Sequence, residues 1–454
     1  MVSKMTWVYA ILGFSAVGCA FAQRKLPLGV FDFADIIAKN FTYTDKSGFI
    51  KAVMTDESRL ILITRPRLFG KATALSMLRY FLENRIHSDT AWKIGFNDLF
   101  QGLSISEDTA FCRAHRGQYP TILLSFENVF AVNYEAAKTA IAISVGEVYR
   151  NHEYLLDDAI LTGEERRTFE LVRDKTAPLA YVTASIGALC QYLHRKNNKS
   201  VILLIGAFEK PFQAAFHNKY TEPMRSLMHD LLFPALKNNP YLLKAVITGV
   251  SIIGQEALLA ELPEVRLHSV LNDQRYTEFF GFLESDVRAL AAETGLTAKR
   301  ELLDTWYRGY DISGTLLYNP FSVLSFLSQG GKPGFYWVRH SLTEFVVKLI
   351  FAMSSPMRMD FDNLMFNKSL DKMVYNEMPY QKLVSQEEPF WTLLVHNGYL
   401  VAKPKGPPGL YAVRMPNKEI RDELFDMCKK KIEGKMDAKN PNVSYARYTP
   451  SYAK

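Results

Sequence analysis

The sequence has few cysteines, only a small excess of charge of one sign and few long apolar runs. Four cysteines among 454 residues exclude a small fold framed by disulfides. The 54 basic and 47 acidic residues give a net charge of +7, which permits contact with nucleic acid but does not argue for it. No internal repeat or low-complexity tract is present. What remains, 48% apolar and 22% charged residues, is typical of a folded protein of two or three domains and excludes disorder, collagen and coiled coil.

The most apolar stretch lies at the N-terminus. Lys4 precedes the apolar run Met5–Phe21, and Ala20-Phe21-Ala22 is a small-x-small cleavage signature. This pattern predicts a signal peptide cleaved after Ala22, hence a secreted protein without a membrane span after cleavage. A membrane anchor needs ~20 apolar residues, which the run does not reach. A lipoprotein signal at Cys19 is the weaker alternative, because no leucine-led lipobox precedes it.

Two further features bear on the secreted form. Cleavage leaves Cys112, Cys190 and Cys428, which allow one disulfide and one free thiol. Glycosylation sequons fit passage through a eukaryotic secretory pathway, although such triplets also arise by chance. They begin at Asn40, Asn198, Asn367 and Asn442.

Short apolar runs alternate with helical patterns in the first 275 residues, which predicts a parallel α/β sheet covered by helices on both faces. The expected strands are 60–64, 121–126, 200–205, 244–248 and 266–270. Helical patterns dominate afterwards, at 284–310, 322–328 and about 340–397. Then 399–402 and 411–414 form a hairpin and Asn417 caps a last helix to about 432, a winged-helix-like arrangement. The expected division is 1–22 signal peptide, 23–275 α/β domain, 276–335 helical lid-like region, 336–435 helical and winged-helix-like domain, and 436–454 flexible tail.

Gly70-Lys71 lies between the strand 60–64 and a helix expected over 72–84, which is the layout of a P-loop. In such a loop, backbone N–H groups and the helix N-terminus hold phosphate and the lysine reaches the β/γ oxygens. Arg65 stands where the usual first glycine belongs. The alternative interpretation is that Lys71 is only a surface residue of the first helical turn.

A series of blocks resembles the predicted AAA-ATPase-like family, whose members are usually fused to a C-terminal nuclease domain of the PD-(D/E)XK class. The resemblance covers roughly 25–425 and implies a P-loop NTPase fold of the ASCE/AAA-like type, followed by the helical and winged-helix-like parts. The blocks are Lys25–Gly29, Tyr43–Lys46, Thr64–Lys71, Leu204–Pro211, Thr248–Ser251, Trp306–Tyr310, Tyr318–Ser322, Asn397–Leu400 and Pro416–Glu419.

The sequence departs from the family where the chemistry is done. The family loop is similar to R-P-R-R-F-G-K-S, and here Leu68 replaces an arginine and Ala72 replaces the magnesium-binding serine. The hydrolytic strand usually reads D-E-Y-D-K-P, and here Gly206 and Ala207 replace the Asp that supports magnesium and the Glu that polarises water. Ile252 stands where an arginine usually follows the Thr-Gly-Val-Ser block. We therefore expect neither ATP hydrolysis nor a catalytic residue, and no magnesium.

Binding a phosphate requires fewer residues than hydrolysing ATP does. Arg67, Gly70 and Lys71 are the candidates for binding ATP or ADP without metal. Glu209 could replace the missing carboxylates only if the backbone shifted, because it stands three residues past Gly206, beyond the expected strand end.

The region after Arg421 is too short for a nuclease domain, so we expect no nuclease activity. The leading hypothesis is a secreted, degenerate AAA-ATPase-like protein that binds an unidentified protein partner. One alternative is a weak ATP-binding protein or ATPase that uses Lys71. The other is a nucleic-acid-binding protein that uses the winged-helix-like end and the basic run Lys429–Lys431.

Overall fold

The computed structural model describes residues 24–84, 99–157, 159–251, 261–262, 264–337, 346–347, 349–351, 354–376 and 387–439. The expected signal peptide, Ile252, the sequon at Asn442 and the chain after residue 439 lie outside these residues.

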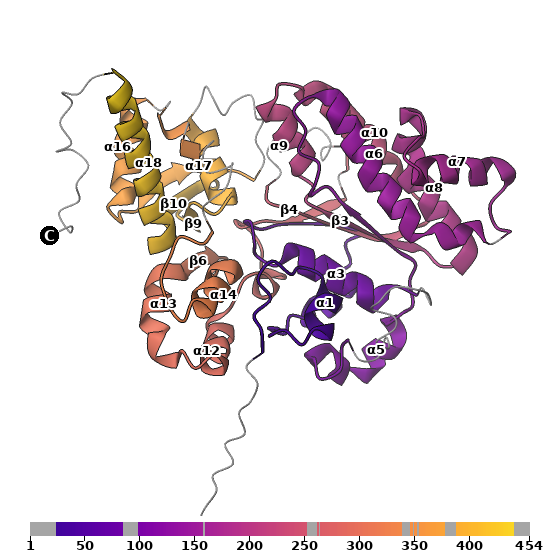
Figure 1. Cartoon of the computed structure of the whole chain (residues 1–454), viewed down its shortest axis with the longest axis horizontal. Coiled ribbons are helices and arrows are strands. Elements are labelled where there is room, and N and C mark those ends of the chain that lie inside the picture. The colour runs from indigo at the N-terminus through magenta and orange to yellow at the C-terminus, as the bar shows by residue number, and fades with distance from the viewer. Residues whose placement is uncertain are drawn as a thin grey trace, which may run out of the picture.

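A parallel five-stranded sheet forms the centre of the first half (Figure 1). Its strand order is β2-β3-β4-β1-β5. All five apolar runs expected as strands are strands of this sheet, with ends shifted by at most two residues, and the predicted α/β fold class is confirmed. The strands are β1 (Leu60–Thr64), β2 (Thr121–Ser125), β3 (Val201–Gly206), β4 (Leu242–Gly249) and β5 (Val265–His268).

Helices cover both faces of the sheet because alternate strand residues point to opposite sides. Ile61 and Ile63 pack with the helices on one face, and Leu60 and Leu62 pack with those on the other. The first face carries α1 (Phe33–Ala38), α2 (Gly48–Met54), α3 (Lys71–Leu82) and α5 (Thr109–His115). The second carries α6 (Tyr134–Asn151), α7 (Gly163–Arg173), α8 (Leu179–Asn197), α9 (Lys210–His217) and α10 (Thr221–Leu236), as Figure 1 shows.

The region after the sheet is less helical than expected. The pattern 284–310 divides into α12 (Glu284–Glu293) and α13 (Arg300–Tyr307). An antiparallel hairpin follows, of β6 (Arg308–Ile312) and β7 (Thr315–Tyr318), where the sequence indicated only an irregular stretch. Then α14 runs from Pro320 to Ser328. We call residues 276–328, which include α12 to α14 and their connections, the lid region.

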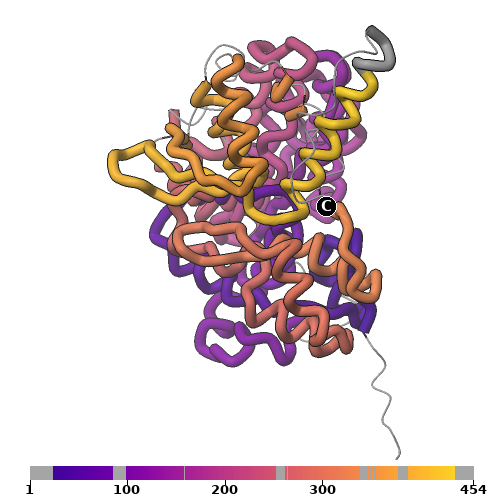
Figure 2. Tube along the Cα trace, turned by 90° about the vertical axis from the view of Figure 1, so that its left-hand side faces the viewer, coloured from indigo at the N-terminus to yellow at the C-terminus, as the bar shows by residue number. Residues whose placement is uncertain are grey.

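The C-terminal module has its own three-stranded antiparallel sheet, in the order β8-β10-β9. The expected hairpin is present as β9 (Val401–Pro404) and β10 (Leu410–Arg414), and Figure 2 shows it projecting from one side. The third strand, β8 (Leu370–Met373), lies where only helix was expected. The helices are α16 (Ser355–Met365), α17 (Glu387–His396) and α18 (Lys418–Lys439). The winged-helix assignment stays a prediction.

Asn417 caps α18 as expected, since its Oδ1 accepts from the N–H of Ile420 at 3.1 Å. The helix continues to Lys439, past the end expected at about residue 432. None of the described helices combines the length and the apolar character that a membrane crossing requires.

The lid region and the C-terminal module meet at Gly309. A Cβ at this residue would lie 1.9 Å from the carbonyl oxygen of Pro416, and φ is +133°. Only glycine allows this approach of two main chains.

We predict that Gly309→Ala costs roughly 3 kcal/mol or more of unfolding free energy, because a main chain must move to remove the overlap. Gly314→Ala is the matched control, since φ there is +88° with nothing within 4 Å of the added Cβ. It should cost about 1 kcal/mol, the strain of the left-handed backbone alone. Urea unfolding measures both, and equal losses would contradict the role given to the contact.

Candidate functional site

The loop from Arg65 to Gly70 joins β1 to α3 at the carboxyl edge of the sheet. Leu68 and Gly70 have φ of +61° and +87°, which turn the chain sharply into the helix. Lys71 is the first residue of α3. The first N–H groups of a helix have no partner within it and lie at the positive end of its dipole, so this position can hold an anion.

Lys71 contacts its own loop. Its Nζ donates to the carbonyl oxygen of Arg65 at 2.8 Å and to that of Pro66 at 2.7 Å. Burial lowers the pKa of Lys71 to about 8, and the nearby charge of Glu209 opposes this shift. The ammonium must therefore leave two carbonyls in order to reach a phosphate.

Glu209 lies in the site, contrary to the expectation from strand alternation. Ala207, just after β3, has a left-handed φ of +54°, and the turned chain brings Glu209 back over the sheet edge at only 2% exposure. Its Oε2 would lie 2.7 Å from a Cβ at Gly249, and no described residue gives this atom a hydrogen bond. Burial raises the pKa of Glu209, while the charge of Lys71 opposes the rise.

The positions that would serve magnesium lack donor atoms. Ala72 is the second residue of α3, and Gly206 ends β3. Glu209 is the one buried carboxylate at this edge with an unpaired oxygen in the described chain. The described residues also contain no cluster of three or more His, Cys, Asp or Glu side chains suited to a metal. A magnesium shell built on these residues does not fit, and we assign it no step.

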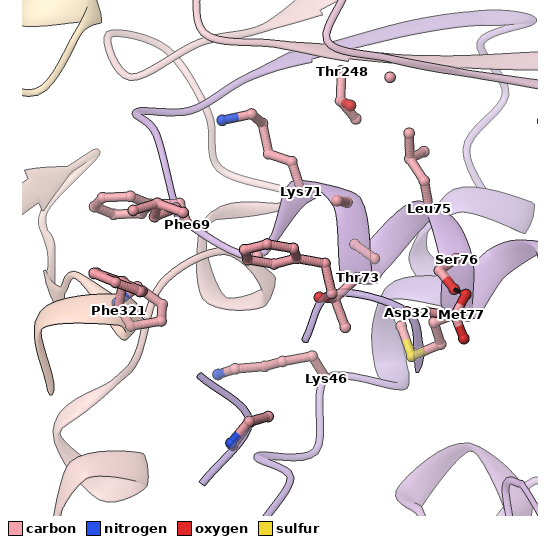
Figure 3. Close-up of a pocket in the computed structure, with 18 of the residues that line it drawn as sticks. Asp32, Lys46, Phe69, Lys71, Thr73, Leu75, Ser76, Met77, Thr248 and Phe321 are labelled. Carbon is pink, nitrogen blue, oxygen red and sulfur yellow. Dashed lines mark hydrogen bonds between the residues drawn. The ribbon is translucent and has the colours of Figure 1, made fainter. Parts of the chain in front are cut away.

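A cavity of about 460 Å³ opens beside the loop and α3. Figure 3 shows Lys71 on one side and Lys46 on the other, with Phe69 and Phe321 beside the space between them. Most of the lining away from Lys71 is apolar, contributed by the N-terminal segment and the lid region. These residues are Pro27, Val30, Phe31, Phe279, Phe282, Leu290, Pro320, Phe321 and Leu324.

The charged groups around the cavity differ in how far they are paired. Lys46 Nζ lies 2.6 Å from Asp286 Oδ2, and both side chains are largely buried. Lys210 Nζ lies 3.5 Å from an oxygen of Glu127. Within the described chain the guanidinium of Arg67 has no ion pair, and it lines the cavity. The cavity thus has a cationic end that suits phosphate, at Arg67 and Lys71, and the rest of it is mostly apolar.

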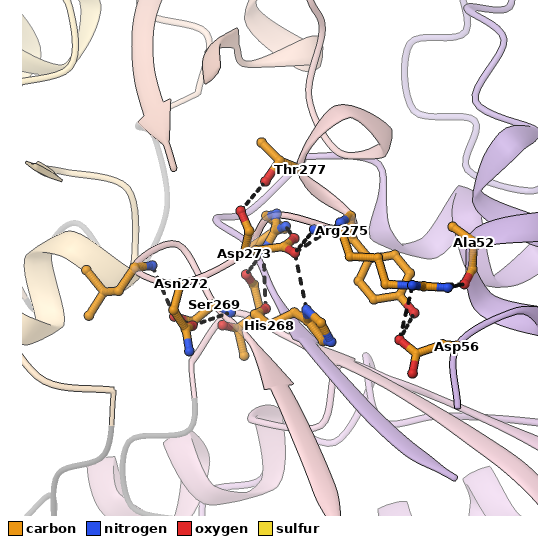
Figure 4. A network of polar contacts seen from close by, with 12 residues as sticks. Ala52, Asp56, His268, Ser269, Asn272, Asp273, Arg275 and Thr277 are labelled. Carbon is orange, nitrogen blue, oxygen red and sulfur yellow. Dashed lines mark hydrogen bonds and ion pairs between the residues drawn. The ribbon is translucent and has the colours of Figure 1, made fainter. Parts of the chain in front are cut away.

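A buried ion pair holds the start of the loop. Arg65, fully buried, donates to Asp273 and to the carbonyl oxygen of Thr64 at 2.7 Å. Asp273, which lies beside His268 and Arg275 in Figure 4, also accepts the N–H groups of Arg275 at 2.8 Å and Tyr276 at 3.0 Å. Burial of Asp273 opposes ionisation, but hydrogen bonding with His268 and the Arg65 charge outweigh it and lower the pKa to about 2. The sequence alone gave no signal for Asp273.

Other expected features do not join the site. Cys112, Cys190 and Cys428 are free thiols, so no disulfide links them. In α18, Lys430 lies 2.6 Å from Asp426, Lys429 lies 3.8 Å from Glu433, and Lys431 lies over the ring of Phe351. The basic run is therefore engaged within its own module.

The parallel sheet and the glycine-lysine loop at the N-terminus of α3 define a protein of the P-loop NTPase class. The family model described as "Predicted AAA-ATPase" matches residues 27–259, and the chain belongs to this AAA-ATPase-like family. The chain is also 24% identical, over 409 residues, to an uncharacterized protein in the vnfD 5′ region of Azotobacter chroococcum mcd 1. That match covers 89% of this chain and 69% of the relative.

We predict that Asp273→Asn costs about 3–5 kcal/mol of unfolding free energy, because it leaves the Arg65 guanidinium buried without a counter-charge. Asp35→Asn is the control, since Asp35 pairs with Lys39 at 3.1 Å in an exposed position. It should cost less than about 1 kcal/mol. Urea unfolding measures both, and a small loss in Asp273→Asn would show that the buried pair does not hold the loop.

Proposed function

We propose that this protein is a secreted AAA-ATPase-like module that binds a nucleoside di- or triphosphate without efficient hydrolysis and acts through binding. The observation that carries the proposal is the cavity beside the loop. One end has Arg67, Lys71 and the N-terminus of α3, and the rest is mostly apolar. A nucleotide has the same division into an anionic and a flat, weakly polar part.

The contacts at the phosphate end support binding. The guanidinium of Arg67 and the first N–H groups of α3 are available to phosphate oxygens, and Lys71 lines the same cavity. The volume of about 460 Å³ is within the range of small-molecule sites. These features favour the nucleotide-binding alternative over a module without a ligand.

The residues at the metal-binding and water-activating positions argue against efficient ATP hydrolysis. Ala72 and Gly206 offer no oxygen to magnesium, and Ala207 cannot polarise water. Glu209 is a single buried carboxyl, whose pKa burial raises while the charge of Lys71 opposes the rise. One residue cannot replace both the metal ligand and the base.

The proposal has two further parts: the protein is secreted, and it acts by binding a partner. The N-terminal signal-type segment supports export, and a protein that uses a nucleotide only as a bound ligand needs no continuous supply of ATP. The partner would be a protein, because acidic residues of α18 beside Lys429 and Lys430 reduce the local positive charge that nucleic acid would need. Pull-down with the mature form tests this part, and recovery of nucleic acid alone would contradict it.

We predict that ATP and ADP stabilise the mature protein, by about 2.7 kcal/mol at a concentration 100 times the Kd. Lys71→Ala should lose this stabilisation. Lys39→Ala, at an exposed position outside the cavity, should retain it. Thermal unfolding with each nucleotide, with and without magnesium, measures the effect.

Two results would contradict the proposal. No stabilisation by either nucleotide would remove nucleotide binding. Steady ATP turnover that Lys71→Ala abolishes would remove the claim that hydrolysis has been lost.

We predict that affinity for ADP falls about tenfold between pH 7 and pH 9. Lys71 is charged below its pKa of about 8 and loses its charge above it, whereas a terminal phosphate with a second pKa of about 6 is already ionised. Lys71→Arg, which stays charged, should give a flat profile. Calorimetric titration at several pH values measures both proteins, and an equal decline in both would exclude Lys71 as the cause.

A further inference from the structure

The carbonyl groups of the loop are bound from two directions. Lys71 Nζ donates hydrogen bonds to the carbonyl oxygens of Arg65 and Pro66. The carbonyl oxygen of Arg67 accepts from Trp337 Nε1 at 3.0 Å and from Asn319 Nδ2 at 3.2 Å. Both donors lie after the sheet, more than 250 residues along the chain. The loop is thus fixed partly by residues outside the α/β domain.

A second carbonyl of the loop is held in the same way. The carbonyl oxygen of Phe69 accepts from the N–H of Gly281 at 3.2 Å. The ring of Phe69 also packs edge-on against Tyr310, with centroids 5.0 Å apart. The lid region therefore contacts this part of the loop through its main chain and through a ring.

A buried carboxylate in α18 organises both donors to Arg67. Glu419, with no exposed surface, accepts from the N–H of Trp337 at 2.9 Å and from Ser322 Oγ at 2.7 Å. Ser322 in turn donates its N–H to Asn319 Oδ1 at 3.1 Å. Glu419 thus holds the main chain of Trp337 directly and Asn319 through Ser322.

Peptide geometry connects these contacts to ligand binding. The C=O and N–H of one trans peptide point in opposite directions, so each anchored carbonyl fixes the direction of the next N–H. The carbonyl of Arg67 sets the N–H of Leu68, and that of Phe69 sets the N–H of Gly70. Backbone N–H groups of this kind are the donors with which a P-loop holds phosphate.

We propose that Trp337 and Asn319, held by Glu419, are positioning residues that orient the loop N–H groups for a nucleotide phosphate. This inference rests on the proposed function. Pre-organised donors bind more tightly because less conformational freedom is lost on binding. By reciprocity, a phosphate that tightens the Arg67–Leu68 peptide also tightens Trp337 and the start of α18.

Trp337→Phe is the test variant, because it removes the N–H donor to Arg67 and keeps an aromatic ring. Trp306→Phe is the control, since Trp306 lies in the lid region against Tyr307 and Phe335 and beneath Lys418, and the contacts given for it among the described residues include none with the loop. We expect Trp337→Phe to weaken ADP binding about two- to tenfold, the range of one hydrogen bond. Trp306→Phe should bind like the unaltered protein.

Amide hydrogen exchange without nucleotide gives a readout that is independent of binding. In Trp337→Phe the segment 65–71 should exchange faster, while the strands keep their protection. In the unaltered protein, ADP should slow exchange at 334–337 and at the start of α18, and Trp337→Phe should lose this response. If Trp337→Phe does not fold, Asn319→Asp tests the same carbonyl, because the carboxylate still accepts from Ser322 N but cannot donate to Arg67.

The outcomes separate the two proposals. Unchanged exchange at 65–71 in both variants would overturn the positioning role, whatever the nucleotide result. Faster exchange at 65–71 together with no ADP binding by the unaltered protein would support the positioning of the loop and refute the proposed function. Equal weakening of ADP binding in Trp337→Phe and Trp306→Phe would also overturn the specific role of the Arg67 contact.

Discussion

The buried pair of Arg65 and Asp273 is the interaction on which the arrangement around the loop depends. A guanidinium loses much hydration energy when it is buried, so the fold must supply acceptors for it. Thr64, at the end of β1, and His268, at the end of β5, supply main-chain carbonyls, and Asp273 supplies the charge. One side chain thus joins two strand ends to the turn that leads into the lid region. The loop begins from a fixed point because a displaced Arg65 would leave the buried Asp273 without its counter-charge.

Much of the sheet could be predicted from the sequence, because strands buried on both faces are continuous apolar runs and leave a strong local signal. The hairpin β6–β7 and the strand β8 were not expected. Each is short, and β8 has only partly buried or exposed residues, so its pairing with β10 comes from tertiary contact and not from a local pattern.

The site was only partly predictable. Gly70 and Lys71 follow a strand and begin a helix, so their place at the N-terminus of α3 could be read locally. The position of Glu209 depends on a left-handed conformation at Ala207, which alanine rarely adopts and which no residue type there announces. The contact of Trp337 with Arg67 joins residues 270 positions apart, and a single sequence contains no signal for such a pair.

The bonds of Lys71 to its own loop have a consequence for discrimination among anions. A ligand that draws the ammonium away must replace two good main-chain acceptors, so the energy gained is a difference between two sets of bonds. A small monovalent anion offers little more than the carbonyls already provide, whereas a chain of phosphates offers several charged oxygens at once. Under the proposed function, the bonds of Lys71 to its own loop therefore set a charge threshold, which a polyphosphate crosses and a simple salt anion does not.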